Sequence, residues 1–329
     1  MQKYLNEIDN FKKFSNKINC NIAIIGSGRW AKIIISEIKK NFSNKKKIFV
    51  ITNYQNQIEK WKRKKNINNL IISNNYRNLK EHQVNYAIIV NKNKDHYKVC
   101  KKILNINCNA LVEKPLIANL EKINNLVKFS IKKKLFIIIG MQFFFSYFFY
   151  HVKEQKIKKK IVKELEFKWF DKNNEKRHGK KKHHDPNINY LEDIFYHIYS
   201  IIYIFLGEGK INIENKYYFS TKSNSVIFFY NNCKINLNYS KKSNFRKRNL
   251  KIKLSNNESI DINFSNYKKI YIKKNNKKYQ IQKKLCQGAL KYELLNYFNL
   301  SNYSKEKKIN DIRKLNNFFK NLDIIKNIR

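Results

Sequence analysis

The sequence predicts an α/β protein in which a doubly wound parallel sheet is followed by a second domain with a mostly antiparallel sheet. Three observations predict it. The chain has 329 residues, which is long for one core and suits two domains. Up to about residue 140, short apolar strands alternate with helical stretches, as in a parallel sheet covered on both faces. After residue 141, short segments of alternating polarity predominate, as in an antiparallel sheet with one covered face.

The strands of the first part are short, mostly apolar runs without a polar face, and most are followed by a helical stretch. The predicted strands are Asn21–Ile25, Ile48–Thr52, Leu70–Ile72, Tyr86–Val90, Ala110–Val112 and Leu135–Ile139. The predicted helices are Trp30–Lys39, Gln55–Lys65, His96–Leu104 and Leu120–Lys133.

The second part begins with the predicted strand Val162–Phe170, a polar loop over 171–187 and the apolar helix Ile188–Leu206. Six short strands follow, at Ile211–Phe219, Val226–Tyr230, Lys234–Tyr239, Leu250–Leu254, Ile260–Phe264 and Ile270–Ile272. Two helices, 287–299 and 309–327, close the chain. We therefore expect an N-terminal extension over 1–19, a first domain over 20–140, and a second domain over 141–329 that includes the closing helices.

The net charge of +46 is the most extreme feature of the composition. Such a surface attracts nucleic acid or anionic membranes. However, 62 of the 70 basic residues are Lys, which occur in nearly every segment, whereas phosphate recognition usually recruits Arg. Asn, Ile, Phe and Tyr are abundant too, and all of these residues share AT-rich codons. The bias of an AT-rich genome explains the pattern, so we expect no specific nucleic-acid partner. A selected polyanion-binding role is the alternative.

The five cysteines have neither CxxC nor zinc-ligand spacing, which predicts buried thiols in a reducing compartment and no metal site. The apolar run Ile194–Leu206 is shorter than a membrane span, and His197 interrupts it. Residues 1–19 lack the apolar core of a signal peptide. We therefore expect a cytoplasmic protein that does not associate with membranes.

Glycine is rare, with 7 residues in the chain, yet two glycines directly follow the first strand. The run Gly26-Ser27-Gly28-Arg29-Trp30-Ala31 matches the GxGxxG/A pattern between a strand and a helix. The first Gly permits a tight turn, and the second lets backbone N–H groups approach a pyrophosphate at the helix N-terminus. The pattern predicts dinucleotide binding, with an ordinary strand–helix turn as the alternative.

The end of the second strand bears on the choice of dinucleotide. A carboxylate there normally binds the ribose hydroxyls, but this chain has Thr52 and Asn53. Because no carboxylate would repel a 2′-phosphate, the sequence favours NADP over NAD.

Two further patterns indicate catalysis. Glu113-Lys114-Pro115 ends the fifth strand, at the edge of the sheet where ligands bind, and Pro is even rarer than Gly. Lys114 there can donate to a substrate oxygen. Asp193 and His197 are four residues apart on one helix face, where His197 can act as general acid and base. The alternative is a surface Lys and a structural helix His.

Together these motifs resemble the Gfo/Idh/MocA oxidoreductases, the family of glucose–fructose oxidoreductase and the inositol dehydrogenases. Ile88–Asn93 followed by His96 resembles the family's fourth strand and turn, and Leu111–Leu116 its EKP motif. Ile139–Gln142 resembles the crossover into the second domain. Asp193 and His197 resemble the family's Asp-x-x-x-His pair, and the closing helices its last two helices.

The resemblance implies hydride transfer between a nicotinamide and a carbon bearing oxygen, on a sugar, a cyclitol or a related metabolite, with an imine acceptor left open. It assigns Lys114 to the substrate oxygen, His197 to acid/base chemistry and Asp193 to its orientation. The residues expected to bind the cofactor are Gly26, Ser27, Gly28, Arg29, Trp30, Thr52, Asn53, Asn91, Asn93, His96, Glu113, Lys114 and Gln142.

The chain departs from the family at Lys92, where a Pro is usual, at Asn91, where a small residue is usual, and in lacking the acidic end of the second strand. The polar stretch 169–189 is expected to face the substrate. His183-His184-Asp185 within it is not expected to bind a metal, because adjacent His side chains seldom share one ion. A homo-oligomer formed through the C-terminal sheet, a catalytically inactive dinucleotide-binding protein and a basic RNA-binding protein all remain open.

Overall fold

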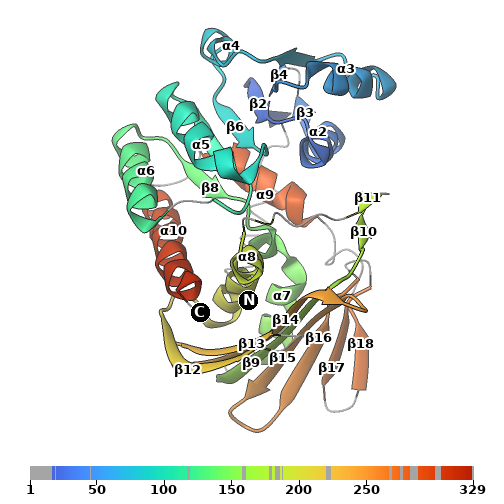
Figure 1. The fold of residues 1–329 in the computed structure, drawn as a ribbon, viewed down its shortest axis with the longest axis vertical. Helices are drawn as coiled ribbons and strands as arrows, with labels where there is room; N and C mark the ends of the chain where they lie inside the picture. Colours follow the sequence, from blue (N-terminus) through green and yellow to red (C-terminus); the bar gives the residue numbers. More distant parts are fainter. Residues whose placement is uncertain are drawn as a thin grey trace. The chain divides into compact units, whose positions relative to one another are not determined.

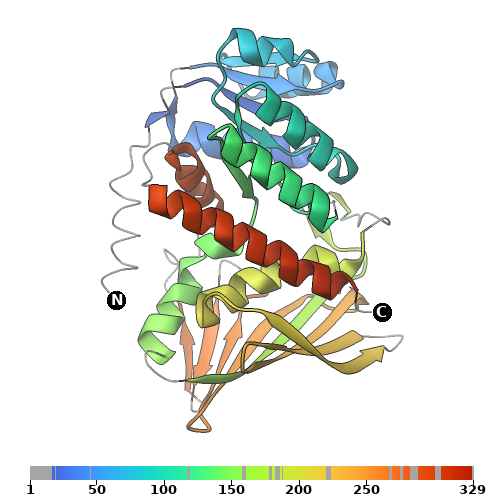
Figure 2. The ribbon, with the colours of Figure 1, turned by 90° about the vertical axis from the view of Figure 1, so that its left-hand side faces the viewer.

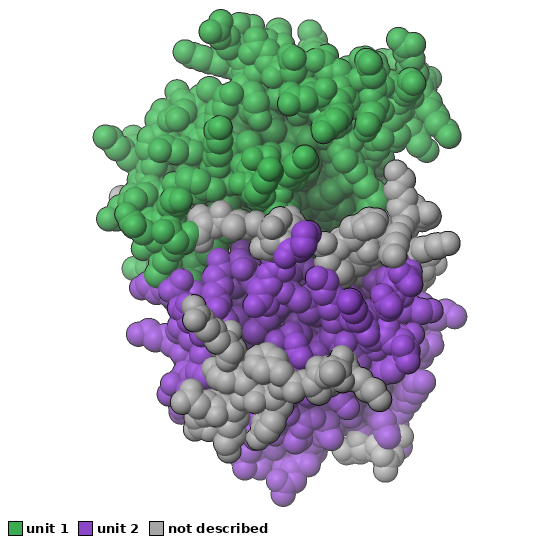
Figure 3. Space-filling view, in the orientation of Figure 1, with its two compact units in different colours: residues 1–142, 290–319 green, residues 143–289, 320–329 purple. Residues whose placement is uncertain are grey.

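The structure is a computed structural model, and it describes residues 17–18, 20–44, 46–116, 119–157, 161–177, 180–181, 186, 188–219, 224–266, 269–274, 277–281, 288–300 and 305–327. The chain forms two compact units (Figure 3). The first unit contains Met1–Gln142 and Leu290–Phe319, and the second contains Phe143–Ala289 and Lys320–Arg329.

The first unit contains a six-stranded sheet in which every strand is parallel to its neighbours, in the order β5-β4-β2-β6-β7-β8. Its strands are β2 (Ile22–Ile25), β4 (Ile48–Ile51), β5 (Leu70–Ser73), β6 (Tyr86–Ile89), β7 (Asn109–Val112) and β8 (Ile137–Ile139). This is the predicted doubly wound fold. The strand order reverses between β2 and β6, where ligands bind in such sheets.

The helices of the first unit are α2 (Arg29–Asn41), α3 (Gln55–Lys64), α4 (Arg77–Glu81), α5 (His96–Asn105) and α6 (Leu120–Lys132). Figure 1 shows α2 on one side of the sheet and α5 and α6 on the other. The helix α2 buries Ala31, Ile34, Ile35 and Ile38, a helical spacing that places all four on the sheet. The helix α4 was not predicted, because five residues with one buried side chain leave no periodic pattern. Two short strands, β1 (Lys17–Ile18) and β3 (Ser43–Asn44), pair in parallel.

The helix α9 (Ala289–Phe298) also belongs to the first unit, although the sequence analysis assigned it to the second domain. Leu294, Leu295 and Tyr297 are part of the same buried cluster as the strands β2, β4 and β6. The Tyr297 hydroxyl accepts from the N–H of Ala87 at 3.0 Å and lies 2.9 Å from the Ala87 carbonyl oxygen. Apolar burial and these hydrogen bonds therefore attach the C-terminal segment to the sheet.

The second unit contains an eight-stranded sheet in the order β12-β13-β14-β9-β15-β16-β17-β18, in which only β14 and β9 are parallel. Its strands are β9 (Val162–Lys172), β12 (Ile211–Phe219), β13 (Asn224–Tyr230), β14 (Cys233–Ser243), β15 (Lys247–Leu254), β16 (Ser259–Asn263), β17 (Tyr271–Lys274) and β18 (Lys277–Gln280). Buried residues alternate with partly exposed ones along β15. The predicted, mostly antiparallel sheet with one covered face is thus confirmed.

Two helices of the second unit, α7 (Tyr147–Val152) and α8 (Tyr190–Leu206), lie over the covered face of this sheet (Figures 1 and 2). Asn189 caps α8, and its side chain accepts from the N–H of Leu191 at 2.9 Å. The long helix α10 (Lys305–Lys326) follows α9, and its last residues belong to the second unit. The predicted polar loop 171–187 includes two short paired strands, β10 (Lys176–Arg177) and β11 (Lys180–Lys181).

Candidate active site

The glycine loop between β2 and α2 has the backbone geometry that its sequence pattern predicts. Gly26 has a φ of +127°, and a Cβ there would lie 2.9 Å from the Val90 carbonyl oxygen. Gly28 is the N-cap of α2, and a Cβ there would meet nothing within 4 Å. No side chain caps this helix, and no acidic residue lies in its first turn. The N-terminus of α2 is therefore open to an anion such as a pyrophosphate.

The end of β4 is joined to this loop by hydroxyl groups. The Ser27 and Thr52 hydroxyls share a hydrogen bond of 2.8 Å, and Thr52 Oγ1 also accepts from the N–H of Tyr54 at 3.0 Å. Both Ser27 and Thr52 are buried, whereas Asn53 and Tyr54 are exposed. Thr52 thus holds the two loops together, and the side chains of Asn53 and Tyr54 are the ones available to a ligand at this strand end.

His96, at the start of α5, joins the turns that follow β6 and β7. Its Nδ1 lies 2.9 Å from the Pro115 carbonyl oxygen, and its Nε2 lies 3.2 Å from the Asn91 carbonyl oxygen. The side chain is 1% exposed. Burial lowers the pKa of His96, although the carbonyl groups around it offset part of the effect. His96 therefore connects these two turns through their backbone carbonyl groups.

Glu113 connects the EKP motif to the glycine loop. Its Oε1 accepts from the Trp30 indole N–H, and its Oε2 accepts from the Lys114 backbone N–H at 3.1 Å. Burial raises the pKa of Glu113 to about 7, while Trp30 and Lys114 favour its charged form. Gly140 leaves room for this carboxyl group, because a Cβ there would lie 3.1 Å from it. The peptide bond between Lys114 and Pro115 is cis.

Several of the predicted cofactor residues therefore lie along one edge of the first unit's sheet. Gly26 and Gly28 follow β2, Asn91 follows β6, and Lys114 follows β7, and these three strands are neighbours. The carboxyl ends of parallel strands meet at the same edge, so the loops that carry these residues converge. Asn91 adds a buried Oδ1 that has no hydrogen-bond partner among the described residues.

In the second unit, aromatic rings hold the imidazole of His197. Trp169 of β9 stacks on it at a centroid distance of 5.5 Å, and Phe143 contacts it edge to face at 5.1 Å. Asp193 lies one turn earlier, in the first turn of α8. Both side chains are partly exposed. The predicted pair thus lies on one helix, and two aromatic rings pack against the imidazole.

A buried ion pair packs against Trp169 and was not predicted from the sequence. The Arg248 guanidinium packs 4.1 Å from the Trp169 ring centroid and pairs with the Asp171 carboxylate, and both charged side chains are 2% exposed. Arg246 pairs with Glu175 at 3.0 Å and lies 3.6 Å from Asp171. Arg248 faces Asp171 only because β15 pairs with β9 in one register, and the sequence gives no direct sign of that register. Because Arg is scarce among the basic residues, the presence of Arg248 was the sign in the sequence that could have pointed to this ion pair.

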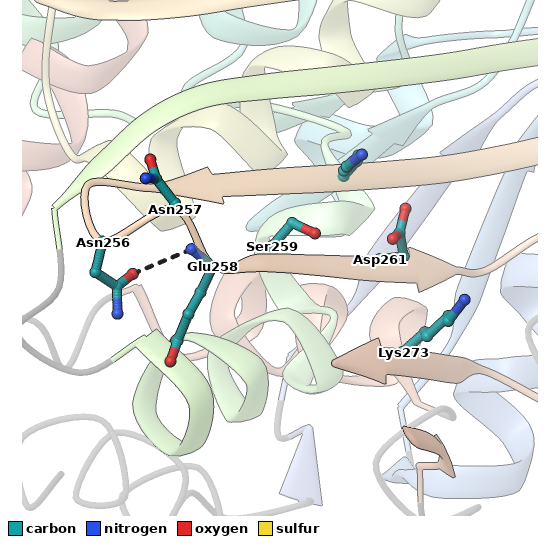
Figure 4. A pocket seen from close by; sticks show the side chains of 7 residues that line it. Asn256, Asn257, Glu258, Ser259, Asp261 and Lys273 are labelled. Carbon is teal, nitrogen blue, oxygen red and sulfur yellow. Dashed lines mark hydrogen bonds between the residues drawn. The ribbon is translucent and has the colours of Figure 1, made fainter. Parts of the chain in front are cut away.

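A shallow pocket on the uncovered face of the second sheet lies apart from these residues (Figure 4). It is lined by Lys251, Asn256, Asn257, Glu258, Ser259, Asp261 and Lys273. Lys251, Asp261 and Lys273 are cross-strand neighbours of alternating charge. The side chains of Leu250 and Ile252, which alternate with Lys251, are buried on the opposite face. The pocket contains none of the residues predicted to act in catalysis.

Within the described part of the chain, no three His, Cys, Asp or Glu side chains are placed to hold a metal ion. His183, His184 and Asp185 lie outside the described residues. In the same part of the chain, no helix has both the length and the apolar character that crossing a membrane requires.

The comparisons with known proteins agree with this geometry. Residues 20–141 match the Gfo/Idh/MocA family, described as an oxidoreductase family with an NAD-binding Rossmann fold. No curated protein sequence matches the chain.

Solved structures similar to this chain include three proteins with a named activity. A dehydrogenase (MviM) from Clostridium difficile has a TM-score of 0.68 and 16% identity, over 94% of this chain and 99% of that chain. UDP-N-acetylglucosamine 3-dehydrogenase from Acidithiobacillus ferrooxidans has a TM-score of 0.69 and 14% identity, over 86% and 88%. Biliverdin reductase from Synechocystis sp. PCC 6803, in complex with biliverdin and NADP+, has a TM-score of 0.70 and 11% identity, over 94% and 98%. At these identities the likeness shows the fold.

The glycine loop, the doubly wound sheet and the matched segment define the class of the protein as a dinucleotide-binding oxidoreductase.

Proposed function

We propose that this protein transfers a hydride between NADP(H) and a carbon bearing oxygen on a small polar metabolite, such as a sugar, a cyclitol or a related compound. The observation that carries the proposal is the uncapped N-terminus of α2, where Gly28 leaves open space. The loop after the neighbouring strand β6 carries Asn91, and the loop after the next strand, β7, carries Lys114. Two similar structures, UDP-N-acetylglucosamine 3-dehydrogenase and a biliverdin reductase bound to NADP+, support redox chemistry with a dinucleotide, and the first supports a sugar-like substrate.

The residues present fit a dinucleotide. The space beside Gly28 is free of protein atoms, and the first-turn N–H groups of α2 carry the partial positive charge that a pyrophosphate needs. When bound, the dinucleotide supplies or accepts the hydride. We propose Gly26, Ser27, Gly28, Arg29 and Trp30 for the pyrophosphate loop. We further propose Asn91, Asn93, Glu113, Lys114 and Gln142 for the nicotinamide end.

The proton chemistry is assigned to three side chains. We propose that Lys114 donates a hydrogen bond to the substrate oxygen and that the His197 imidazole takes up or releases the proton. Asp193 orients the imidazole or a substrate hydroxyl from one helical turn away. The rings of Trp169 and Phe143 support this role, because they fix the plane of the imidazole. The cytoplasmic location and a homo-oligomer through the C-terminal sheet stay predictions.

The test of the cofactor site is a Gly28→Val variant. Its φ of −65° suits any residue and its Cβ meets no protein atom, so the variant should fold with nearly unchanged stability. The added methyl groups would occupy the pyrophosphate position, so affinity for NADPH in a fluorescence titration should fall by roughly a hundredfold or more. Ser36→Val, on the exposed face of the same helix, is the matched control and should bind normally. A folded Gly28→Val protein with normal affinity would refute the assignment.

The choice between the two dinucleotides is tested separately. Because neither Thr52 nor Asn53 carries a charge, we expect NADPH to bind at least as tightly as NADH. Asn53→Asp places a carboxylate on an exposed side chain at this strand end and should weaken NADPH binding by about tenfold, leaving NADH nearly unaffected. A clear preference of the unmodified protein for NADH would contradict the proposed use of NADP.

A further inference from the structure

A charged side chain, Arg248, lies on the covered face of the second unit's sheet. The next residues of β15 that share this face, Leu250 and Ile252, are buried and apolar. The Arg248 guanidinium and the Asp171 carboxylate with which it pairs are each 2% exposed. Taking two charges out of water costs about as much as their attraction returns, so a buried ion pair is weak evidence for a gain in stability. Apolar side chains of similar volume would fill the same space, and the pair therefore calls for another reason.

Hydrogen bonds hold the guanidinium group of Arg248 in one orientation. Its Nη1 donates to the carbonyl oxygens of Phe170 at 2.5 Å and Lys247 at 2.9 Å, and its Nη2 donates to the Asp171 carboxylate. The backbone is anchored too, because the Arg248 N–H donates to the Ser265 hydroxyl at 2.8 Å. A planar fork with several donors binds in a set direction, whereas an apolar side chain can pack in several rotamers. The ion pair thus supplies orientation that apolar packing would not.

The guanidinium group of Arg248 lies over the indole ring of Trp169. Its central carbon is 4.1 Å from the ring centroid, and the two residues are directly opposite each other in the pairing of β9 with β15. A cation is attracted to an aromatic face, and the attraction is larger where water is excluded. Phe143 and Phe264 contact the same ring edge to face, at centroid distances of 6.0 and 6.1 Å. Trp169 therefore packs against a cation whose own orientation is set by hydrogen bonds.

The same indole ring stacks on the imidazole of His197. The two ring centroids are 5.5 Å apart, and the ring planes differ by 20°. Phe143 contacts the imidazole edge to face at 5.1 Å, so the ring has an aromatic neighbour on a second side. Stacked rings keep their contact only while their planes stay nearly parallel. A change in the tilt of Trp169 is therefore passed on to the plane of the imidazole.

We propose that Arg248 is a positioning residue for His197. Held in place by Asp171, it fixes the tilt of the Trp169 ring, and that ring sets the plane in which the imidazole lies. Each link of this series is a contact within the second unit. A misplaced general acid or base lowers the rate of a reaction, so Arg248 contributes to turnover through the imidazole. This last step rests on the proposed function of His197, whereas the positioning itself does not.

The decisive measurement is the proton chemical shift of the His197 imidazole C–H groups in the ligand-free protein, assigned by their loss in His197→Gln. Compared in the neutral form, at the high-pH plateau, these resonances should lie upfield of those of an exposed histidine, because the imidazole stacks on an indole. Trp169→Leu should remove most of the displacement. Arg248→Met combined with Asp171→Asn removes both charges together and leaves no unpaired carboxylate at this place. This double variant should lose about half of the displacement or more.

Two further variants separate orientation from charge and from general effects on the sheet. Arg248→Lys keeps a cation for Asp171 but loses the planar fork, so it should fold and still reduce the displacement. Lys253→Met is the matched control, because Lys253 is ion-paired on the same strand but is 41% exposed on the uncovered face. It should leave the His197 resonances unchanged.

Two results would overturn the proposal. One is a His197 resonance at the position of an exposed histidine in the unmodified protein, which requires no variant to fold. The other is a full displacement in the folded double variant, or in Arg248→Lys where the double variant does not fold, because the ion pair would then serve only the sheet. The measurement uses neither dinucleotide nor substrate, so it is independent of the proposed function. If the resonances behave as expected but His197→Ala keeps its turnover, the catalytic assignment fails and the positioning of the imidazole stands.

Discussion

Gly26 and Gly28 are two residues apart in one loop, but the folded backbone requires a glycine only at Gly26. Gly26 has a left-handed φ of +127° and packs directly against the backbone of Val90. Gly28 has an ordinary φ of −65° and faces open space. The first glycine is therefore a requirement of the fold, whereas the second is explained by the proposed binding of a dinucleotide. In a chain with few glycines, that difference separates a stability defect from a binding defect.

This difference predicts the effect of Gly26→Ala. The added Cβ would approach the Val90 carbonyl oxygen to 2.9 Å in a backbone conformation that L-residues avoid. We expect a loss of about 1–3 kcal/mol in the free energy of unfolding, measured with urea. Gly28→Ala is the matched control and should change stability by less than about 0.5 kcal/mol. Equal stabilities of the two variants would contradict the strain assigned to Gly26.

At the level of whole elements, one hydroxyl group adds hydrogen bonds to the apolar packing of α9 on the sheet of the first unit. The Tyr297 hydroxyl lies within 3.0 Å of the N–H and within 2.9 Å of the carbonyl oxygen of Ala87, and 2.8 Å from the carbonyl oxygen of Asn109. It therefore contacts the backbones of both β6 and β7. The ring of Tyr297 packs edge to face on Tyr86 at 5.2 Å. Helix and sheet are thus joined by a polar contact inside an apolar cluster.

Removing this hydroxyl should destabilise the first unit. Tyr297→Phe leaves the ring in place but deprives buried backbone groups of their partner, which costs about 1–3 kcal/mol. Tyr54→Phe, at a residue that is 57% exposed, is the control and should change stability by less than about 0.5 kcal/mol. Urea unfolding followed by circular dichroism measures both variants. A Tyr297→Phe protein as stable as the control would show that the hydroxyl does not hold α9.

Most of the elements could be predicted, because strands such as Ile22–Ile25 are continuous apolar runs and their loops carry scarce residues such as Gly28 and Pro115. The assignment of α9 could not be predicted. Its Leu and Tyr residues predict an apolar helix face, but they do not indicate whether that face packs in the core of the first or of the second unit. The Arg248–Asp171 pair depends on strand register, which only the folded sheet displays.

For the whole molecule, the proposed catalytic residues come from both units. Lys114 belongs to the first unit, and Asp193 and His197 belong to the second. Each unit supports its own residues. In the first unit, the Glu113 carboxyl group accepts a hydrogen bond from the backbone N–H of Lys114. In the second unit, Trp169 and Phe143 pack against the His197 ring. The rates of single and double variants therefore test whether these side chains act as one catalytic group.

We expect Lys114→Ala and His197→Ala each to lower the rate of hydride transfer by about 10²–10⁴, measured in single turnovers with the substrate once it is identified. The double variant should be little slower than either single variant, because residues that act together are not additive. NADPH binding should survive in all three proteins, since the pyrophosphate loop is intact. Near-normal turnover in His197→Ala would make it a structural residue of α8 and exclude the proposed mechanism.

The return of Leu290–Phe319 to the first unit also determines when that unit can be completed during synthesis. The ribosome makes residues 143–289 after the strands of the six-stranded sheet and before α9, which at about 5–20 residues per second takes roughly 7–30 s. Throughout that interval the nascent sheet lacks Leu294, Leu295 and Tyr297, which later fill its core. A nonsense codon among residues 143–289 would therefore remove part of the first unit, although the codon lies far downstream of the glycine loop.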